Sequence, residues 1–157
     1  MKTPPGACSR RVSRVAAGLV LVLCGALPLL AAQLRLELKL IWATDDEKYA
    51  KHERVDPATT EKLRKIFKWK HYFVINTVRG VVPNRGTNSF KMSDKCTIEI
   101  AEQPGTRIEV KLIGEGKPVV KATKDLASGE WVTIGGDDKD GTGWFVLIKQ
   151  LDDKAGR

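Results

Sequence analysis

The sequence predicts a small, mainly antiparallel all-β domain: a β-sandwich or partly open barrel of roughly seven to eight strands with one short helix. Three observations support this fold class. Segments of alternating apolar and polar residues recur along the chain. Turn residues separate these segments at intervals of roughly eight to twelve positions, and the strand–helix–strand alternation of a parallel sheet is missing. The pattern therefore favours strands that follow one another through short turns.

The most regular alternation spans Leu34 to Trp42, with leucine at every second position as far as residue 40. Charged residues fill most of the positions between the leucines. Because successive side chains of a strand point to opposite faces, this pattern predicts a strand with one apolar face. Such a strand would aggregate if it were left unpaired, so we expect it to pair within a sheet.

One helix is predicted after a polar segment, residues 43–56, that we expect to form a loop. Asp56 suits the N-cap, because its side chain can accept a backbone hydrogen bond, and Pro57 suits the first helical position. We expect the helix to end at about Phe67. Its predicted apolar stripe consists of Leu63, Ile66 and Phe67.

Four further strands are predicted, the first of them from a run rich in aromatic and β-branched residues. They lie at residues 72–82, 88–92, 131–134 and 144–149. Gly80 interrupts the first of these runs and predicts a bulge or a bend there. The polar, glycine-rich segment from Gly135 to Gly143 is expected to form a solvated hairpin loop.

A meander of three consecutive strands is predicted from residue 96 to residue 122. Pro104-Gly105 and Gly114–Lys117 supply the turn residues that join these strands. Cys96 stands in phase with the apolar residues of the first strand, so we expect it to pack as a small hydrophobic side chain. The outer face of the meander carries charges of both signs, which is typical of a solvated sheet.

The first 32 residues follow the plan of a secretory signal peptide, with basic residues, an apolar run and small residues at a cleavage site. Cleavage after Ala32 would leave a single β-rich domain over residues 33–152 and a disordered tail over residues 153–157. The alternative is an uncleaved signal anchor, because the apolar run over residues 15–32 has about the length that spans a bilayer.

Charge argues against a nucleic-acid partner. The whole chain carries a formal net charge of +8, but four of its 27 basic residues and none of its 19 acidic residues lie in the predicted leader. The net charge of the remaining residues is therefore +4. A moderate charge of this size lacks the strongly basic character that nucleic-acid-binding domains usually show.

Residues that could carry catalysis or hold a metal are few. His52 and His71 are the two histidines, and neither stands at a metal-ligand spacing. A catalytic serine or cysteine would need a base beside it, and Cys96 could meet His71 only after folding. The acidic loop fails the pattern of a helical calcium loop, because Gly136 and Leu147 fall where that pattern needs acidic side chains. We therefore expect no catalytic residue, no metal site and no cofactor.

The strongest candidate for a partner surface is the basic, aromatic segment that follows the helix. Trp42 and Trp144 share the phase of apolar neighbours and are predicted to be core residues, whereas Trp69 and Trp131 are expected to be exposed. The predicted partner surface consists of Lys62, Lys65, Lys68, Trp69, Lys70 and Trp131. Its cations could bind an acidic partner or an anionic membrane surface.

These observations favour an exported, non-catalytic interaction or accessory module of the cell envelope, periplasmic or extracellular, that binds another envelope protein. An exposed edge strand near residue 34 could accept a strand from the partner. The first alternative is a ligand-binding sandwich for a sugar or a lipid, based on exposed tryptophans. The second alternative is the same domain held at the membrane by an uncleaved leader, which would be its only membrane contact.

Overall fold

A computed structural model of the chain describes residues 33–49, 51–138 and 140–152. The predicted leader over residues 1–32 and the predicted tail over residues 153–157 lie outside the described residues. The described chain is mostly antiparallel β, with 59% of residues in strands and 10% in helices, as the sequence predicts. Its strands form two separate sheets and no closed barrel, and no described helix combines the length and the apolar character needed to cross a membrane.

Nine strands, one α-helix and one short 3-10 helix follow one another along the described residues. In chain order they are β1 (Leu34–Thr44), η1 (Glu47–Tyr49), β2 (Glu53–Arg54), α1 (Pro57–Ile66), β3 (His71–Val82), β4 (Thr87–Lys91), β5 (Cys96–Glu102), β6 (Arg107–Gly114), β7 (Lys117–Asp125), β8 (Trp131–Asp137) and β9 (Gly143–Gln150). The segment over residues 43–56, expected to be a loop, therefore contains η1 and β2, and β1 extends two residues into it.

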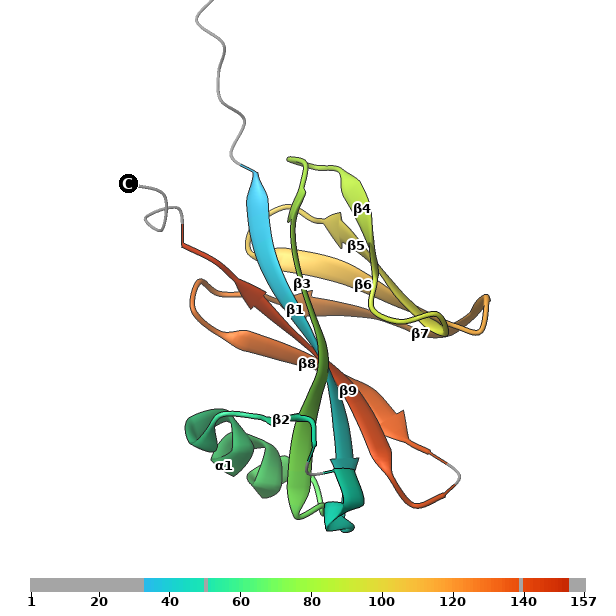
Figure 1. Ribbon diagram of the computed structural model, residues 1–157. Coiled ribbons are helices and arrows are strands. Elements are labelled where there is room, and N and C mark those ends of the chain that lie inside the picture. The colour runs from blue at the N-terminus through green and yellow to red at the C-terminus, as the bar shows by residue number, and fades with distance from the viewer. Residues whose placement is uncertain (1–32, 50, 139, 153–157) are drawn as a thin grey trace, which may run out of the picture.

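The strands divide between a five-stranded sheet, in the order β2-β3-β1-β9-β8, and a four-stranded sheet, in the order β4-β5-β6-β7 (Figure 1). Every pairing between neighbouring strands is antiparallel. The predicted meander is confirmed, because β5, β6 and β7 are neighbours in sequence order. The turn between β3 and β4 carries the chain from one sheet to the other.

The expectation that the first strand offers a free edge is wrong. β1 lies at the centre of the five-stranded sheet, where β3 pairs with one side of it and β9 with the other. Both sets of backbone hydrogen-bonding groups of β1 are therefore occupied, and no strand of a partner can be added there. The outer strands of this sheet are β8 and β2, and β2 is only two residues long.

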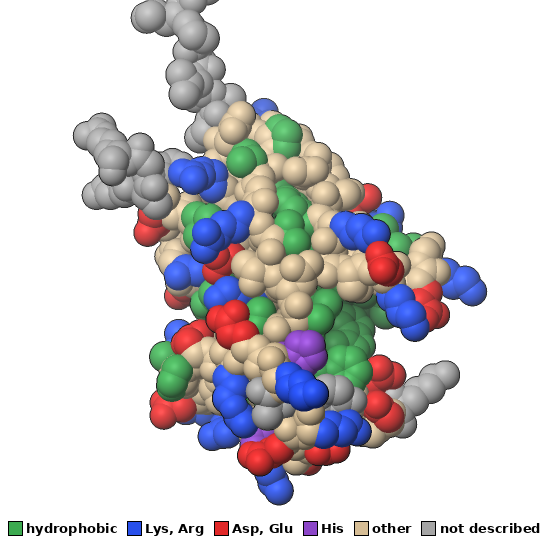
Figure 2. All heavy atoms as spheres, in the orientation of Figure 1, with side chains coloured by type: hydrophobic (Ala, Val, Ile, Leu, Met, Phe, Trp, Pro, Cys, Tyr) green, Lys and Arg blue, Asp and Glu red, His purple; other side chains and the backbone are tan. Residues whose placement is uncertain are grey.

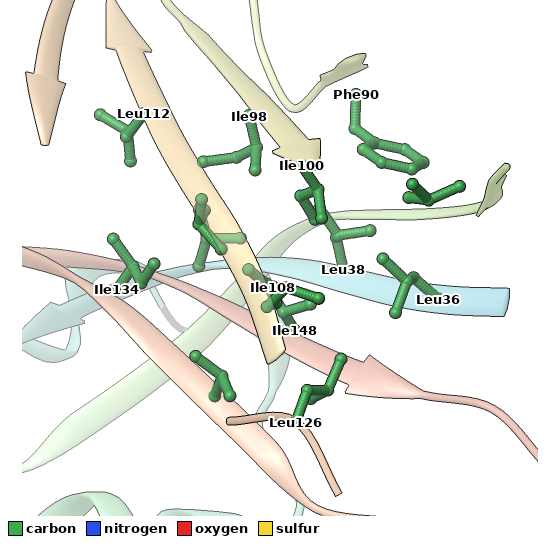
Figure 3. Close-up of a cluster of buried hydrophobic side chains, with 14 of the residues drawn as sticks. Leu36, Leu38, Phe90, Ile98, Ile100, Ile108, Leu112, Leu126, Ile134 and Ile148 are labelled. Atoms are coloured by element: carbon green, nitrogen blue, oxygen red, sulfur yellow. The ribbon is translucent and has the colours of Figure 1, made fainter. Parts of the chain in front are cut away.

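The main core fills the space between the two sheets. Leu36 and Leu38 of β1 are completely buried in this core. Residues two apart in a strand share a face, so this face of β1 is the one that meets the four-stranded sheet. Ile98 and Ile100 of β5 enter the same core from the opposite side (Figure 3). The leucine alternation in the sequence thus specifies the buried face of the central strand.

A second core forms on the other face of the five-stranded sheet, where α1 covers it. Leu63 of α1 packs there with Phe145 and Leu147 of β9. The predicted cap is confirmed, since the Asp56 carboxylate accepts a hydrogen bond from the backbone N–H of Thr59 at 2.9 Å. The predicted stripe is partly wrong. One of its members, Ile66, is 70% exposed, because the helix turns it away from the sheet.

Two strands carry an extra residue, and both extra residues are exposed and apolar. The register between β1 and β3 skips Ile75, and the register between β6 and β7 skips Val119. Gly80, where a bulge or a bend was predicted, instead makes room for an aromatic ring. A Cβ atom at Gly80 would lie 2.6 Å from the Phe90 ring. The glycine in this strand therefore indicates close packing between β3 and β4.

Candidate functional site

The structure brings together the two segments that the sequence marks as unusual: the basic exit of α1 and the acidic loop between β8 and β9. Lys68 Nζ lies 3.7 Å from a carboxylate oxygen of Asp137. The indole nitrogen of Trp69 donates a hydrogen bond to the backbone carbonyl of Gly141 at 2.8 Å. These segments are separated by about seventy residues in sequence, so their contact depends on the complete five-stranded sheet.

Trp69 was expected on the surface, and this expectation is wrong because the side chain is only 3% exposed. The Trp69 ring meets the Phe145 ring edge-on, with 5.5 Å between the ring centroids. Phe67 also packs against the Phe145 ring, with 4.2 Å between the ring centroids. Trp69 therefore anchors the segment after α1, residues 67–70, to β9 and contributes to the core under the helix.

The four lysines of the predicted surface are all exposed, and Lys62 and Lys65 lie on α1 itself. We call Lys62, Arg64, Lys65, Lys68 and Lys70 the basic face. Figure 2 shows basic side chains, with acidic ones among them, over the lower part of the molecule where Figure 1 places α1 and η1. Trp131 is half-buried, and Lys39 and Lys149 lie over its ring at 5.5 and 5.6 Å from the centroid.

A hollow of about 260 Å³ opens between α1, β2 and the start of β3. Its lining residues are Arg54, Val55, Pro57, Thr60, Glu61, Arg64, Lys70, His71 and Tyr72. Three of the lining side chains are permanent cations, and one is a carboxylate. The hollow therefore has the charge of a site for an anionic group.

Local contacts fix the cations around this hollow. Arg64 donates a hydrogen bond through Nη2 to the backbone carbonyl of Lys70 at 2.6 Å. Arg54 Nη1 lies 3.3 Å from His71 Nδ1, and its guanidinium lies over the Phe73 ring at 5.3 Å. These contacts hold both guanidinium groups in place without closing the hollow.

Tyr72 lines the hollow and carries a buried hydroxyl. The residue is 2% exposed, and no described protein group lies within hydrogen-bond distance of its buried hydroxyl. Burial raises the pKa of the phenol, while the charge of Arg64 lowers this pKa and the charge of Asp45 raises it. The hydroxyl itself has almost no accessible surface, so other atoms of Tyr72 line the hollow.

Two tryptophans that were predicted to be core residues, Trp42 and Trp144, are half-buried. They are register partners on β1 and β9, and Phe73 is the partner of Trp42 on β3. Hydrophobic side chains are visible in Figure 2 where Figure 1 shows β1, β3 and β9 crossing below the four-stranded sheet. On β8, Gly136 pairs with Trp144, and no atom lies within 4 Å of the position of a Cβ at this glycine.

No described group of three or more His, Cys, Asp or Glu side chains is arranged to hold a metal ion. In the acidic loop, Asp140 accepts hydrogen bonds from the backbone N–H and the hydroxyl of Thr142, at 3.1 and 2.5 Å. This carboxylate therefore stabilises its own turn. Cys96 packs half-buried against the main core, and burial raises the pKa of its thiol, which disfavours the reactive thiolate.

Comparison with protein-family models, with curated proteins and with solved structures found no match for this chain. The site is therefore described from its own geometry. Sequence reasoning identified Lys70 and the lysines of α1 but missed Arg54, His71 and Tyr72 as parts of one site. The only local signal for these residues is their position on either side of the helix, and no spacing rule connects them.

Proposed function

We propose that this chain is an exported, non-catalytic interaction module of the cell envelope, and that its basic face binds an acidic surface of another envelope protein. One observation carries the proposal. Lys62 and Lys65 form no salt bridge with any described residue, whereas Lys111 and Lys121 on the four-stranded sheet pair with Glu99 and Glu109 at 3.7 and 3.1 Å.

This difference matters because paired lysines are already neutralised by the protein, whereas unpaired ones keep a positive potential that attracts acidic partners. Arg64 and Lys65 lie in the last turn of α1, where cations also stabilise the helix. If these cations had only a structural role, they would stabilise α1 and bind no partner. The proposal adds that these cations, together with Lys70 at the start of β3, form one docking surface.

The test is partner capture from the native envelope, followed by mass spectrometry of the captured proteins. The double variant Lys62→Glu, Lys65→Glu should lose the partner, and the wild-type interaction should weaken as the salt concentration rises. The matched control is Lys111→Glu, Lys121→Glu, which should keep the partner. Recovery of the protein by itself, or equal loss in both variants, would contradict the proposal.

The paired tryptophans Trp42 and Trp144 favour a second candidate function, the binding of a sugar or a lipid. Aromatic rings aligned across neighbouring strands offer an apolar platform for such ligands. Titration with polysaccharide or with lipid vesicles should then change the tryptophan fluorescence, and Trp144→Ala should abolish that change. An unchanged spectrum throughout both titrations would count against this candidate.

Export is also part of the proposal, and it rests on the signal-like plan of the first 32 residues. N-terminal sequencing of the protein isolated from its native envelope tests it. A start near Gln33 would support cleavage and a free domain. A start at Met1 in the membrane fraction would support the alternative in which the leader anchors the same domain.

A further inference from the structure

One outer strand of the larger sheet lacks the features that keep a sheet edge from pairing with another chain. Among the described residues the two sheets end at β2, β8, β4 and β7 (Figure 1). β2 has two residues and β4 has five, whereas β7 contains Pro118, the extra residue Val119 and three lysines. Short strands, bulges, proline and lysine all protect sheet edges. The seven residues of β8 include no lysine, arginine or proline, and their register with β9 is unbroken.

Two backbone hydrogen bonds show which groups of β8 point away from β9. The N–H of Asp138 donates to the carbonyl of Thr142 at 2.8 Å, and this pair continues the register of β8 with β9. Hydrogen-bonded pairs alternate with non-hydrogen-bonded pairs along an antiparallel ladder, so the even-numbered residues of β8 bond to β9. The hydrogen bond from Leu151 to Arg35 on the other side of β9 gives the same assignment. The residues whose backbone groups face the open edge are therefore Trp131, Thr133, Gly135 and Asp137.

We infer that the open edge of β8 pairs antiparallel with the same edge of a second copy of this chain, with a two-fold axis at Ile134. The outward-facing residues are the first, third, fifth and seventh of the strand. Two copies can therefore pair over all seven residues with outward-facing groups opposite one another, which joins the two five-stranded sheets into one. The inference goes beyond the proposed function, because no residue of β8 belongs to the basic face.

The residues that this register places opposite one another fit in size. Opposed residues of an antiparallel pair lie on the same face of the sheet. Val132 of one copy lies opposite Gly136 of the other, where no atom lies within 4 Å of the position of a Cβ. Thr133 lies opposite Gly135, which is exposed. On either side of the axis, each larger side chain thus faces a glycine.

The charges near the ends of the paired strands are also complementary. The register places Asp137 of one copy opposite Trp131 of the other. Lys39 and Lys149 lie over the Trp131 ring, and Lys149 forms no salt bridge with a described residue. The Asp137 side chain is 69% exposed and lies 3.7 Å from the exposed Lys68, so little holds it in its own chain. Because this attraction occurs twice in the dimer, it favours a second copy over an unrelated strand.

The experiment measures the molar mass of the protein, isolated from its native envelope, by sedimentation velocity over a range of protein concentrations. We expect an equilibrium between monomer and dimer. Thr133→Pro should abolish the dimer, because proline removes an outward-facing N–H from the paired edge. The hydrogen bonds between β8 and β9 do not use this N–H, so the variant keeps them.

The matched control is Thr123→Pro, which makes the same substitution at the edge of the other sheet. The N–H of Leu126 donates to the carbonyl of Thr106, and this pair continues the register of β6 with β7. By the same alternation, Thr123 faces the open edge of β7. Thr123→Pro should therefore dimerise like the wild type.

Asp137→Lys tests the charge complementarity at an exposed position, where the substitution leaves the core unchanged. It places a lysine beside Lys39 and Lys149 of the other copy. Because like charges then face each other, the dissociation constant of the dimer should rise about tenfold or more at low salt concentration. If Thr133→Pro fails to fold, this variant decides, and an unchanged dissociation constant overturns the inference.

The remaining outcomes separate this inference from the proposed function. A wild type that stays monomeric at every concentration would overturn self-pairing, as would equal loss of the dimer in Thr133→Pro and Thr123→Pro. If the wild type is monomeric and only Thr133→Pro loses a captured envelope protein, the edge belongs to a strand of that protein and self-pairing is wrong. The double variant Lys62→Glu, Lys65→Glu should still dimerise, so failure of the basic face as a docking surface would leave this inference standing.

Discussion

The indole ring of Trp69 occupies the space in which a side chain at residue 143 would stand. A Cβ atom added to Gly143 would lie 2.5 Å from the nearest ring atom of Trp69, closer than real Cβ contacts allow. The position of the Trp69 ring therefore requires a glycine at residue 143, although Gly143 begins β9 and Trp69 lies in the connection between α1 and β3. This contact joins the start of β9 to the segment after α1 that carries Lys68 and Lys70 of the basic face.

The first prediction concerns this contact. Gly143→Ala should lower the free energy of unfolding by about 1–3 kcal/mol, because the added methyl group forces the Trp69 ring or β9 to move. Gly136→Ala is the matched control on the neighbouring strand, where no atom lies within 4 Å of the added group. Urea denaturation measures both variants. An equal effect of the two substitutions would show that the indole is not tightly packed.

The second prediction concerns the N-cap of α1. Asp56→Ala should destabilise the protein by about 1 kcal/mol, and Asp56→Asn should cost much less because its amide oxygen can still accept the Thr59 hydrogen bond. That hydrogen bond is the main reason why the pKa of Asp56 is lowered from its ordinary value of 3.8. Urea denaturation at neutral pH compares the two variants, and equal losses would contradict the capping role.

The lowered pKa also fixes the pH dependence of this cap. The ionised carboxylate stabilises the folded state above its unfolded pKa, so this contribution is present at neutral pH and is lost as the pH falls below about 3.8. The stability difference between wild type and Asp56→Ala should therefore shrink in that acid range. A difference that grows on acidification would contradict the sign.

The third prediction concerns the ion pair between Glu37 and Arg79, which are register partners on β1 and β3. Glu37 is 7% exposed and accepts a hydrogen bond from Arg79 Nε at 2.6 Å. Arg79→Met should cost about 1–3 kcal/mol, because it removes the main partner of a buried carboxylate. Adding Glu37→Gln to this variant should restore part of the loss, and a double-mutant cycle by denaturation would measure the coupling. Strict additivity would contradict it.

The fourth prediction concerns Cys96. Because burial raises the pKa of its thiol, alkylation by iodoacetamide at neutral pH should be slow in the folded protein and much faster in denaturant. Peptide mass spectrometry can follow this residue separately from the other cysteines. The rate in the folded state should rise with pH as thiolate forms. Fast, pH-independent alkylation of the folded protein would contradict the placement of Cys96 against the core.

Much of the fold could be predicted because its signals are local. The alternation in β1, the Asp56-Pro57 start of α1 and the turn at Gly105 each depend on neighbouring residues, and all three are confirmed. Gly105 has φ of +83°, which a side chain would strain. Position within a sheet is different in kind. Nothing in the alternation of β1 reveals that β9, more than a hundred residues later, pairs with it.

The candidate site depended even more on distant contacts. The sequence around Trp69 is rich in lysine and resembles an exposed segment, but the ring is covered by Phe145 and by the loop before β9. Conversely, Trp42 and Trp144 stand in apolar alternation and are still half-exposed. Alternation identifies the face of a strand, whereas burial also requires that another element cover that part of the face.

The pairing of β1 with β9 also bears on the order in which the protein can fold. The central strand of the larger sheet is made first among the described strands, and one of its two partners is made last. Leu151 donates a backbone hydrogen bond to Arg35 at 2.8 Å, so even the ends of this pair are joined. While the chain is being synthesised, the meander of β5, β6 and β7 can form from local contacts, but β1 must wait with one side unpaired. We therefore expect folding to be slow and to be completed only once β9 has been made, with the waiting strand as the segment most exposed to misassembly.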